Sequence, residues 1–356
     1  MWRHKSSLLV AMAMASPFVG MAGAETSQPQ AQTKVVARQV DQSVQQSAAG
    51  RRRPLKVSKA TPPAKEISSE PREAIPPPYY SFDRLGEHVY SVRWEMALIG
   101  GLLVGVGMRD WDWGGSKFDT INEGWFGSNT RHGGMDKIGH AFSTFVISDL
   151  LTDRIRANAT NATGAEITGA LLGFGIMGLG ETVDGFTGKH RFSREDIIAN
   201  AAGALFSVFR NAVPGISDKL DFRLMYTPAS FERPGVTPDE FTLIPPYERQ
   251  RYILALKGSG FEALKATPLR YLELQAGFQA RGFGDNERRL NYPIERTFYV
   301  GVGLNLNEIL FGDVPYPNLA GYRDTRPAWA ARKALEYLQV PYTAVYYGNT
   351  FSRIQR

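Results

Sequence analysis

Three pairs of polar residues interrupt apolar, glycine-rich stretches of this sequence. The pairs are Asp136 with His140, Glu181 with Asp184, and Asp196 with Asn200. Residues three or four apart lie on the same face of a helix, so each pair presents two polar groups together. Burying such groups is costly unless they pair or bind something. We therefore expect three helices to bring the pairs into one cluster, together with the neighbouring Lys137 and Ser193.

Three kinds of chemistry are open to this cluster. First, the side chains would hydrogen-bond across helices and fix their register without reacting. Second, His140 would be a general base, oriented by Glu181 or Asp196, that hydrolyses an envelope lipid or glycan, because the unperturbed histidine pKa lies near neutrality. Third, His140 would hold a divalent metal with Asp136 and Glu181, or with Asp184 or Asp196. One imidazole with carboxylates suits Mg²⁺, Mn²⁺ or Ca²⁺ better than structural zinc.

Known catalytic motifs give the hydrolytic interpretation little support. The chain contains no Gly-x-Ser-x-Gly sequence, and Ser193-Arg194 is not followed by the histidine that a lipid-phosphate phosphatase needs. His132 and His190 lie in polar, turn-like sequence, and we expect both at the surface. The structural interpretation is therefore favoured, and the cofactor, if there is one, is a divalent metal.

Four helices are expected to position the cluster: Tyr90–Met108, Met135–Arg156, Ala165–Gly185 and Arg194–Asn211. Ser193 fits the N-cap of the last one. The spacings Gly101/Gly105 and Gly169/Gly173 place small residues on one face, as in closely packed membrane helices. The apolar runs of about 12–15 residues are shorter than the roughly 20 of a full span. Short spans, half-inserted helices and a soluble core all remain open, and the pattern favours membrane association.

After Pro214 the apolar period changes to two. Strands are predicted at Leu220–Tyr226, Tyr252–Leu256, Tyr271–Phe283 and Thr297–Leu306, and an amphipathic helix at Ala328–Leu338. In the last two strands, apolar residues alternate with polar or small ones. We expect a small antiparallel sheet that packs its apolar face on the helices.

The N-terminal part predicts export. Basic residues precede an apolar stretch and the small residues Ala22-Gly23-Ala24, so residues 1–24 are interpreted as a cleaved signal peptide, with a retained anchor as the alternative. Residues 25–80 are rich in Gln, Ser and Pro, and we expect a disordered basic linker. Of 41 basic and 35 acidic residues, 11 and 5 precede residue 79, so the remainder is neutral. Nothing in the sequence resembles a nucleic-acid-binding module, and we expect no nucleic acid partner.

The polar motifs also carry a family resemblance. Asp136-Lys137-x-x-His140, Glu181-x-x-Asp184 and Phe192-Ser193-x-x-Asp196-x-x-x-Asn200-x-x-Gly203 resemble the motif series of the VanZ-like superfamily, and more closely its YfiM-like group of predicted periplasmic lipoproteins. The resemblance covers residues 134–209 and implies a cell-envelope role without an assigned activity. The chain has no cysteine, so it lacks the residue that a lipoprotein acylates.

Together these observations predict an α+β protein: a glycine-rich, VanZ-like four-helix bundle over residues 81–215, then an antiparallel β-rich region over 216–356. We expect an exported, periplasmic, membrane-associated protein with a non-enzymatic role in envelope assembly or maintenance. Its expected partner is a membrane or envelope component, and a protein partner is also open. The alternative is an envelope hydrolase or a metal- or ligand-binding protein centred on His140.

Overall fold

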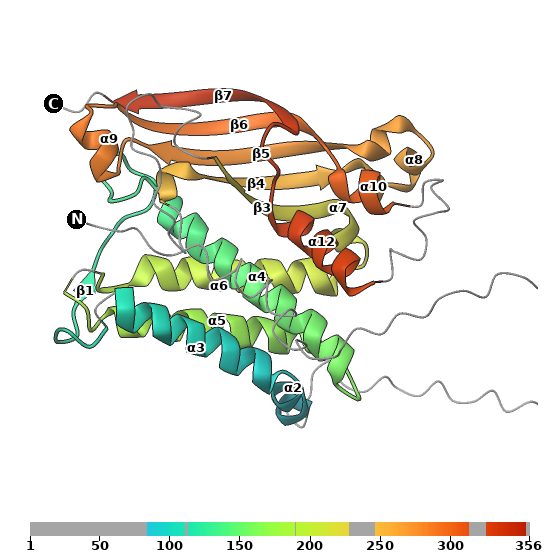
Figure 1. Cartoon of the computed structure of the whole chain (residues 1–356), viewed down its shortest axis with the longest axis horizontal. Coiled ribbons are helices and arrows are strands. Elements are labelled where there is room, and N and C mark those ends of the chain that lie inside the picture. The colour runs from blue at the N-terminus through green and yellow to red at the C-terminus, as the bar shows by residue number, and fades with distance from the viewer. Residues whose placement is uncertain (1–83, 111–112, 189, 228–245, 313–324, 354–356) are drawn as a thin grey trace, which may run out of the picture. The chain divides into compact units, whose positions relative to one another are not determined.

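A computed structural model describes residues 84–110, 113–188, 190–227, 246–312 and 325–353 (Figure 1). Helices come first along the chain, and a five-stranded antiparallel sheet follows them. The predicted α+β class with an antiparallel sheet is therefore confirmed. The expected signal peptide and linker, residues 1–80, lie outside the described residues.

Helix α4 lies between the other long helices and the sheet. It packs on α5 and α6 and also contacts strands β3, β4 and β5, whereas α5 contacts both α3 and α6. The first predicted helix is in fact two, because the chain bends at Val92. The long N-terminal helices are α2 (Leu85–Ser91), α3 (Arg93–Asp110), α4 (Met135–Asn158), α5 (Ala165–Asp184) and α6 (Arg194–Ala212).

Two of the predicted glycine contacts are present and two are not. A Cβ on Gly169 would lie 2.3 Å from Thr152 Oγ1 of α4, and one on Gly173 would lie 2.2 Å from Ser148 Oγ. Gly203 of α6 is closer still, because its Cβ would meet the Ala141 carbonyl oxygen at 2.0 Å. Gly101 and Gly105 of α3 have nothing within 4 Å, so the prediction of close packing is wrong for that pair.

The sheet follows the chain order β3-β4-β5-β6-β7, with every neighbouring pair antiparallel. Its strands are β3 (Leu220–Tyr226), β4 (Gln250–Lys257), β5 (Leu272–Arg281), β6 (Ile294–Leu304) and β7 (Ala344–Arg353). Sequence analysis did not predict β7. It also missed a two-residue parallel pair, β1 (Thr120–Ile121) with β2 (Phe192–Ser193), beside the polar cluster. The predicted C-terminal helix is confirmed as α12 (Arg326–Tyr337).

The outer part of the sheet exposes its apolar face. Leu274 and Val300 alternate with polar or small residues as predicted, yet they are 59 % and 64 % exposed, and Val345 of β7 is 81 % exposed. On the opposite face, Glu273 and Gln275 are buried. The prediction that the apolar face packs on the helices is therefore wrong for these strands. The helices cover only part of the five-stranded sheet. On its other face, buried polar side chains such as Glu273 and Gln275 hydrogen-bond to one another.

Where the sheet does meet the helices, aromatic side chains form the core. Phe142 and Phe145 of α4 pack on Phe222 of β3, with ring centroids 5.2 and 5.9 Å away, and Phe142 also contacts Tyr252 of β4. These rings belong to a buried cluster that also includes Met135, Leu224 and Tyr337. Short helices complete the fold: α7 (Ile216–Lys219), α8 (Glu262–Lys265), α9 (Asp285–Arg289) and α10 (Leu306–Phe311).

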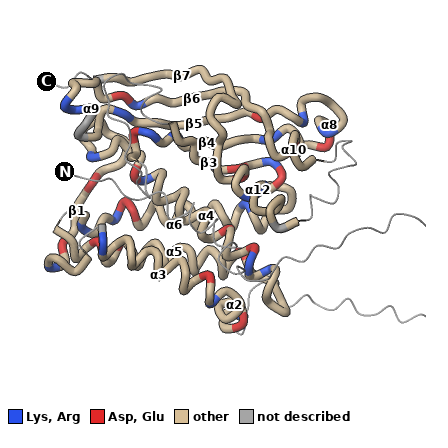
Figure 2. The backbone as a smooth tube through the Cα atoms, viewed as in Figure 1, with Lys and Arg blue, Asp and Glu red and all other residues tan. Residues whose placement is uncertain are grey.

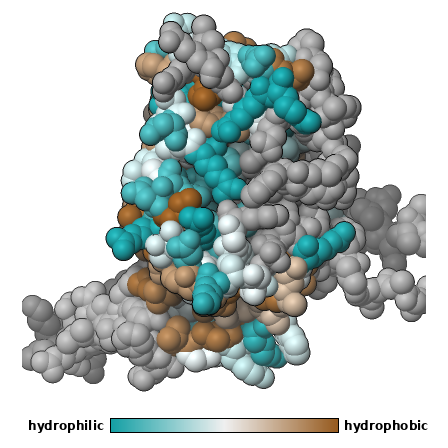
Figure 3. Space-filling model, turned by 90° about the vertical axis from the view of Figure 1, so that its left-hand side faces the viewer, coloured by the Kyte–Doolittle hydropathy of each residue, from teal (hydrophilic) through white to brown (hydrophobic). Residues whose placement is uncertain are grey.

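Charge is unevenly distributed over the helices. Figure 2 shows that Lys, Arg, Asp and Glu are absent from the middle of α3 and α5. On the face in Figure 3, hydrophobic residues gather in the lower part, at the height of α3 in Figure 1. Among the described residues, no single helix is both long and apolar enough to cross a membrane. Helix α2 and residues Arg93–Arg109 of α3 are long and apolar enough together, but a 66° bend separates them.

Candidate functional site

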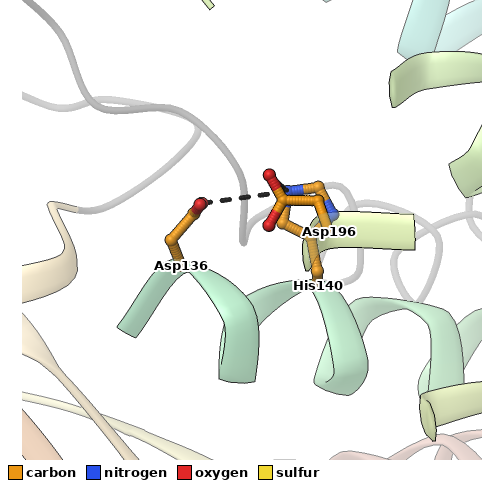
Figure 4. Close-up of side chains that lie close together, drawn as sticks. All are labelled: Asp136, His140 and Asp196. Carbon is orange, nitrogen blue, oxygen red and sulfur yellow. Dashed lines mark ion pairs between the residues drawn. The ribbon is translucent and has the colours of Figure 1, made fainter. Parts of the chain in front are cut away.

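The polar cluster forms where two helices begin. Gly134, with φ 93°, lets the chain turn into α4, which places Asp136 in the first turn and His140 one turn later. Ser193 caps α6 as predicted, since its Oγ accepts a hydrogen bond from the Asp196 amide at 3.3 Å. Figure 4 shows Asp136 and His140 on α4 and Asp196 on a neighbouring helix, with their side chains close together.

Lys137 is the centre of the cluster. Its side chain is only 4 % exposed, and its Nζ lies 2.8 Å from Asp136 Oδ2 and 2.7 Å from Asp196 Oδ1. A third carboxylate, Glu123, also accepts a hydrogen bond from this ammonium. One buried cation is therefore shared by three acidic residues from different parts of the chain.

His140 faces the remaining oxygens of the same aspartates. Its Nε2 lies 3.8 Å from both Asp136 Oδ1 and Asp196 Oδ2, an ion-pairing distance too long for a hydrogen bond. Its other ring nitrogen, Nδ1, lies 3.2 Å from Asn200 Oδ1. Thr144 donates a second hydrogen bond to that amide oxygen. The imidazole is thus held from both sides.

Glu181, Asp184 and Ser193 stand around this centre with other direct partners. Glu181 Oε1 accepts a hydrogen bond from the Ser193 amide at 2.5 Å, so it orders the start of α6. Asp184 Oδ1 accepts one from Trp113 Nε1 at 2.7 Å. Both carboxylates still interact electrostatically with His140. The structure therefore gathers every predicted site residue, although Asp196 and Asp136, not Glu181, face His140 most closely.

The cluster contains more acid than base. Burial raises the pKa of Glu123 and of Glu181 to about 8 and that of Asp184 to about 6. Burial and the charge of Asp136 also raise the pKa of Asp196. These carboxyl groups therefore hold protons more tightly than they would in water.

Two residues of the cluster keep their charge. Burial opposes ionisation of Asp136, but Lys137 and His140 outweigh it and hold the pKa of that carboxyl well below its usual range. Burial also opposes the charge on His140, but Asp196 and Asp136 outweigh it and raise the histidine pKa to about 9. His140 is thus protonated at neutral pH and does not act as a base in that state.

A second buried network has more bases, because Arg223, Lys257 and Lys333 join Arg210 in it. Arg210 of α6 pairs with Asp149 of α4 at 3.1 Å, with Asp221 of β3 at 3.1 Å and with Glu336 of α12 at 3.1 Å. Nearby bases hold the pKa of Asp149 at about 2. Both networks are buried, and burial raises a carboxyl pKa in each of them, at Asp153 in the second. Perturbed groups of this kind gather at functional sites more often than elsewhere.

Four residues of the site were not predicted from the sequence, and the position of His132, which neighbours the site, was predicted wrongly. Glu123 lies in a turn-like segment, and Tyr247, whose hydroxyl donates to Asp136 Oδ1 at 2.6 Å, lies 111 positions along the chain. Trp113 and Thr144 are also absent from the predicted set. His132 was expected at the surface, but it is buried with its ring 4.9 Å from that of Tyr247. Thr144 lies four positions after His140 on the same helix, so its spacing is a signal that could have identified it. No local spacing identifies the other partners.

The arrangement has the right atoms for a small cation. One ligand atom each from Asp136, His140 and Asp196 lies within 4.8 Å of the other two. Lys137 uses one oxygen of each aspartate, and the other oxygen of each lies 3.8 Å from His140 Nε2. That of Asp136 also accepts the hydrogen bond from Tyr247. A divalent ion there would replace the imidazole proton, so the residues fit a carboxylate- and imidazole-bound metal.

One comparison with known proteins finds a similarity over part of the helical region. Residues 122–212 match the model of a family described as "Predicted periplasmic lipoprotein (DUF2279)", whose function is unknown. That segment contains every predicted site residue. No curated protein and no solved structure matches the chain. The match confirms the predicted localisation: the protein is exported, periplasmic and membrane-associated.

Proposed function

We propose that this chain is a non-enzymatic protein of cell-envelope assembly or maintenance, in which the polar cluster joins the helices of a VanZ-like domain. The observation that carries this proposal is the position of Lys137, buried and in contact with Asp136, Asp196 and Glu123. A buried network of side chains that pair across helices fixes helix register. A protonated His140 agrees with this role, because hydrolysis by general-base catalysis requires a neutral imidazole.

Paired substitutions of His140 test this proposal. His140→Gln keeps a polar side chain that can reach Asn200. His140→Ala leaves Asn200 and the aspartates without a polar partner at this position. Each variant would replace the wild-type protein in a strain lacking the gene, and growth under detergent stress would be compared with the melting temperature of the purified protein. We expect function to follow stability, with His140→Gln milder than His140→Ala. Complete loss of function at an unchanged melting temperature would contradict a structural role.

A second candidate, binding of a divalent cation, is favoured by the acid excess and by the two aspartate oxygens that face His140 at 3.8 Å. Chelator-treated protein would be titrated calorimetrically with Mg²⁺, Mn²⁺ and Ca²⁺, with Asp196→Asn as the matched variant. Stoichiometric binding that Asp196→Asn abolishes would support this function. Absence of heat for all three ions would exclude it.

A further inference from the structure

Helices α3, α5 and α6 each contain a long stretch without charge. Residues 96–108, 167–180 and 197–209 include no Lys, Arg, Asp or Glu, and each stretch is 13 or 14 residues long. At about 1.5 Å per residue, each covers about 20 Å of helix. Charged residues return at both ends of every stretch. Three helices in mutual contact through α5 thus share an uncharged middle.

The outward side of each helix is apolar as well as uncharged. On α5 the exposed residues are Leu171, Gly175 and Leu179, one turn apart. On α6 they include Ile198, Leu205 and Phe209, and on α3 they include Leu98, Val104 and Met108. A helix that faces water normally carries polar residues on this side. We name these nine residues the apolar helix face.

The apolar helix face points away from α4. Gly173 of α5 and Gly203 of α6 contact α4, and Leu171 and Leu205 each lie two residues away, about 200° around the helix. Leu103 of α3 lies against Gly180 of α5, and the exposed Val104 and Met108 belong to another side of α3. The apolar helix face therefore lies on the side of the helices opposite α4 and the sheet.

Basic and aromatic groups border the apolar helix face. Arg93 and Arg109 flank the uncharged stretch of α3, and Arg194 precedes that of α6; all three are exposed. Trp94 is 72 % exposed, and Arg93 lies over the Tyr90 ring at 3.9 Å from its centroid. Among the acidic residues at these helix ends, Glu166, Glu181 and Asp196 are buried, and Glu95 pairs with Arg154. Glu195, beside Arg194, is half-buried. The rim of this surface is thus positively charged, and anionic lipid head groups complement it.

We propose that the apolar helix face lies on an anionic phospholipid bilayer, with α3, α5 and α6 parallel to the membrane plane. The apolar side chains enter the boundary between head groups and acyl chains, while Arg93, Arg109 and Arg194 pair with lipid phosphates. The parallel orientation follows from charge at both ends of stretches that are about 20 Å long, since the hydrocarbon core is roughly 30 Å thick. This inference rests on the membrane association of the protein and is independent of the role of the polar cluster.

Because the chain has no cysteine, single cysteines can be introduced for spin labelling without background. Labels at Leu179→Cys and Leu205→Cys would be compared with a label at the exposed Glu262→Cys of α8. The full chain would be mixed with vesicles of phosphatidylethanolamine and phosphatidylglycerol. We expect the first two labels to become accessible to oxygen and shielded from a water-soluble nickel chelate, and the third to stay accessible to the chelate. Helix-face labels that remain open to the chelate while the protein floats with vesicles would overturn the proposed surface without challenging membrane association.

A matched pair of charge insertions provides the second test. Leu205 on α6 and Leu269 before β5 are both exposed leucines, so Leu205→Glu and Leu269→Glu should both fold. Vesicle flotation should weaken about tenfold or more for Leu205→Glu, because a carboxylate would enter the apolar boundary, and should be unchanged for Leu269→Glu. Equal weakening by both variants, or failure of the wild-type chain to float, would overturn the proposal.

Discussion

At the scale of single residues, the polar cluster contains few basic groups and many acidic ones. Lys137 and His140 are surrounded by five carboxyl groups, and burial raises the pKa of two of them, Glu123 and Glu181, to about 8. The cluster is therefore sensitive to pH around neutrality.

The raised pKa values predict that stability falls as the pH rises. Unfolded His140 loses its proton near 6.5, whereas the folded residue keeps it up to about 9. Its stabilising effect is thus fully present below pH 6.5 and is lost as the pH rises through 9. Glu123 and Glu181 act in the same direction between 4.5 and about 8, since their folded forms retain protons that the unfolded chain releases.

Urea unfolding at a series of pH values checks this prediction. The free energy of unfolding of the chelator-treated wild type should decline from pH 6.5 to 9, and His140→Gln should decline less over the same interval. If the two curves run parallel, His140 does not titrate as its surroundings imply.

The sequence predicted this site well where partners share a helix and poorly where they do not. Spacings of three and four identified Asp136, His140, Glu181, Asp184, Asp196 and Asn200 as pairs, and the cost of burying polar groups led us to expect one cluster. Glu123 and Tyr247 reach it from irregular segments, where the position of a side chain depends on the path of the whole chain. The protonation of His140 was likewise beyond prediction, because it depends on carboxylates from another helix.

At the scale of elements, glycine allows the helices around the cluster to approach. Gly203 lies against the α4 backbone next to His140, whereas Gly175 on the outer side of α5 touches nothing within 4 Å. The same residue type therefore has opposite consequences at the two positions.

Substituting alanine at each position tests this difference. Gly203→Ala should lower the free energy of unfolding by about 1–3 kcal/mol, because its methyl group overlaps the Ala141 carbonyl. Gly175→Ala should raise it by up to about 1 kcal/mol through better helix propensity. Chemical denaturation of both variants measures the two effects. Similar losses in both would show that contact with α4 is not what distinguishes Gly203.

The elements also show where periodicity stops being informative. Strand β3 agrees with its predicted bounds residue for residue, and α4 to α6 differ from prediction by only one or two residues at the C-terminal end. Periodicity of two grouped Leu274 with Leu272 and Phe278 correctly, but it contains no information about which face neighbours cover. Strand β7 escaped prediction because Tyr346, Tyr347 and Gly348 break a simple alternation of apolar and polar residues.

At the scale of the whole molecule, Arg210 joins the helices to the sheet. It lies on α6 and pairs with α4, β3 and α12 through Asp149, Asp221 and Glu336. Three separate elements therefore lose a shared partner if this guanidinium is removed.

Arg210→Met should lower the free energy of unfolding by about 3–5 kcal/mol, because it leaves buried carboxylates without their partner. Arg154, which is 45 % exposed and pairs with Glu95, is the matched control, and Arg154→Met should cost about 1 kcal/mol or less. Circular dichroism during urea unfolding measures both. A loss for Arg210→Met no greater than that of the control would show that the elements are held together by apolar contacts alone.

The most direct test of the central claim is the free energy of unfolding of Lys137→Met in chelator and in excess Mn²⁺, beside the wild type. If Lys137 neutralises the buried carboxylates of the cluster, the free energy of unfolding of the variant should fall by about 3–5 kcal/mol. That of the wild type should be the same with and without the metal. Lys265→Met, which removes an exposed pair with Glu262, should change little in either condition. A Lys137→Met protein as stable as the wild type, or a wild type that Mn²⁺ stabilises strongly, would contradict a self-satisfied structural cluster.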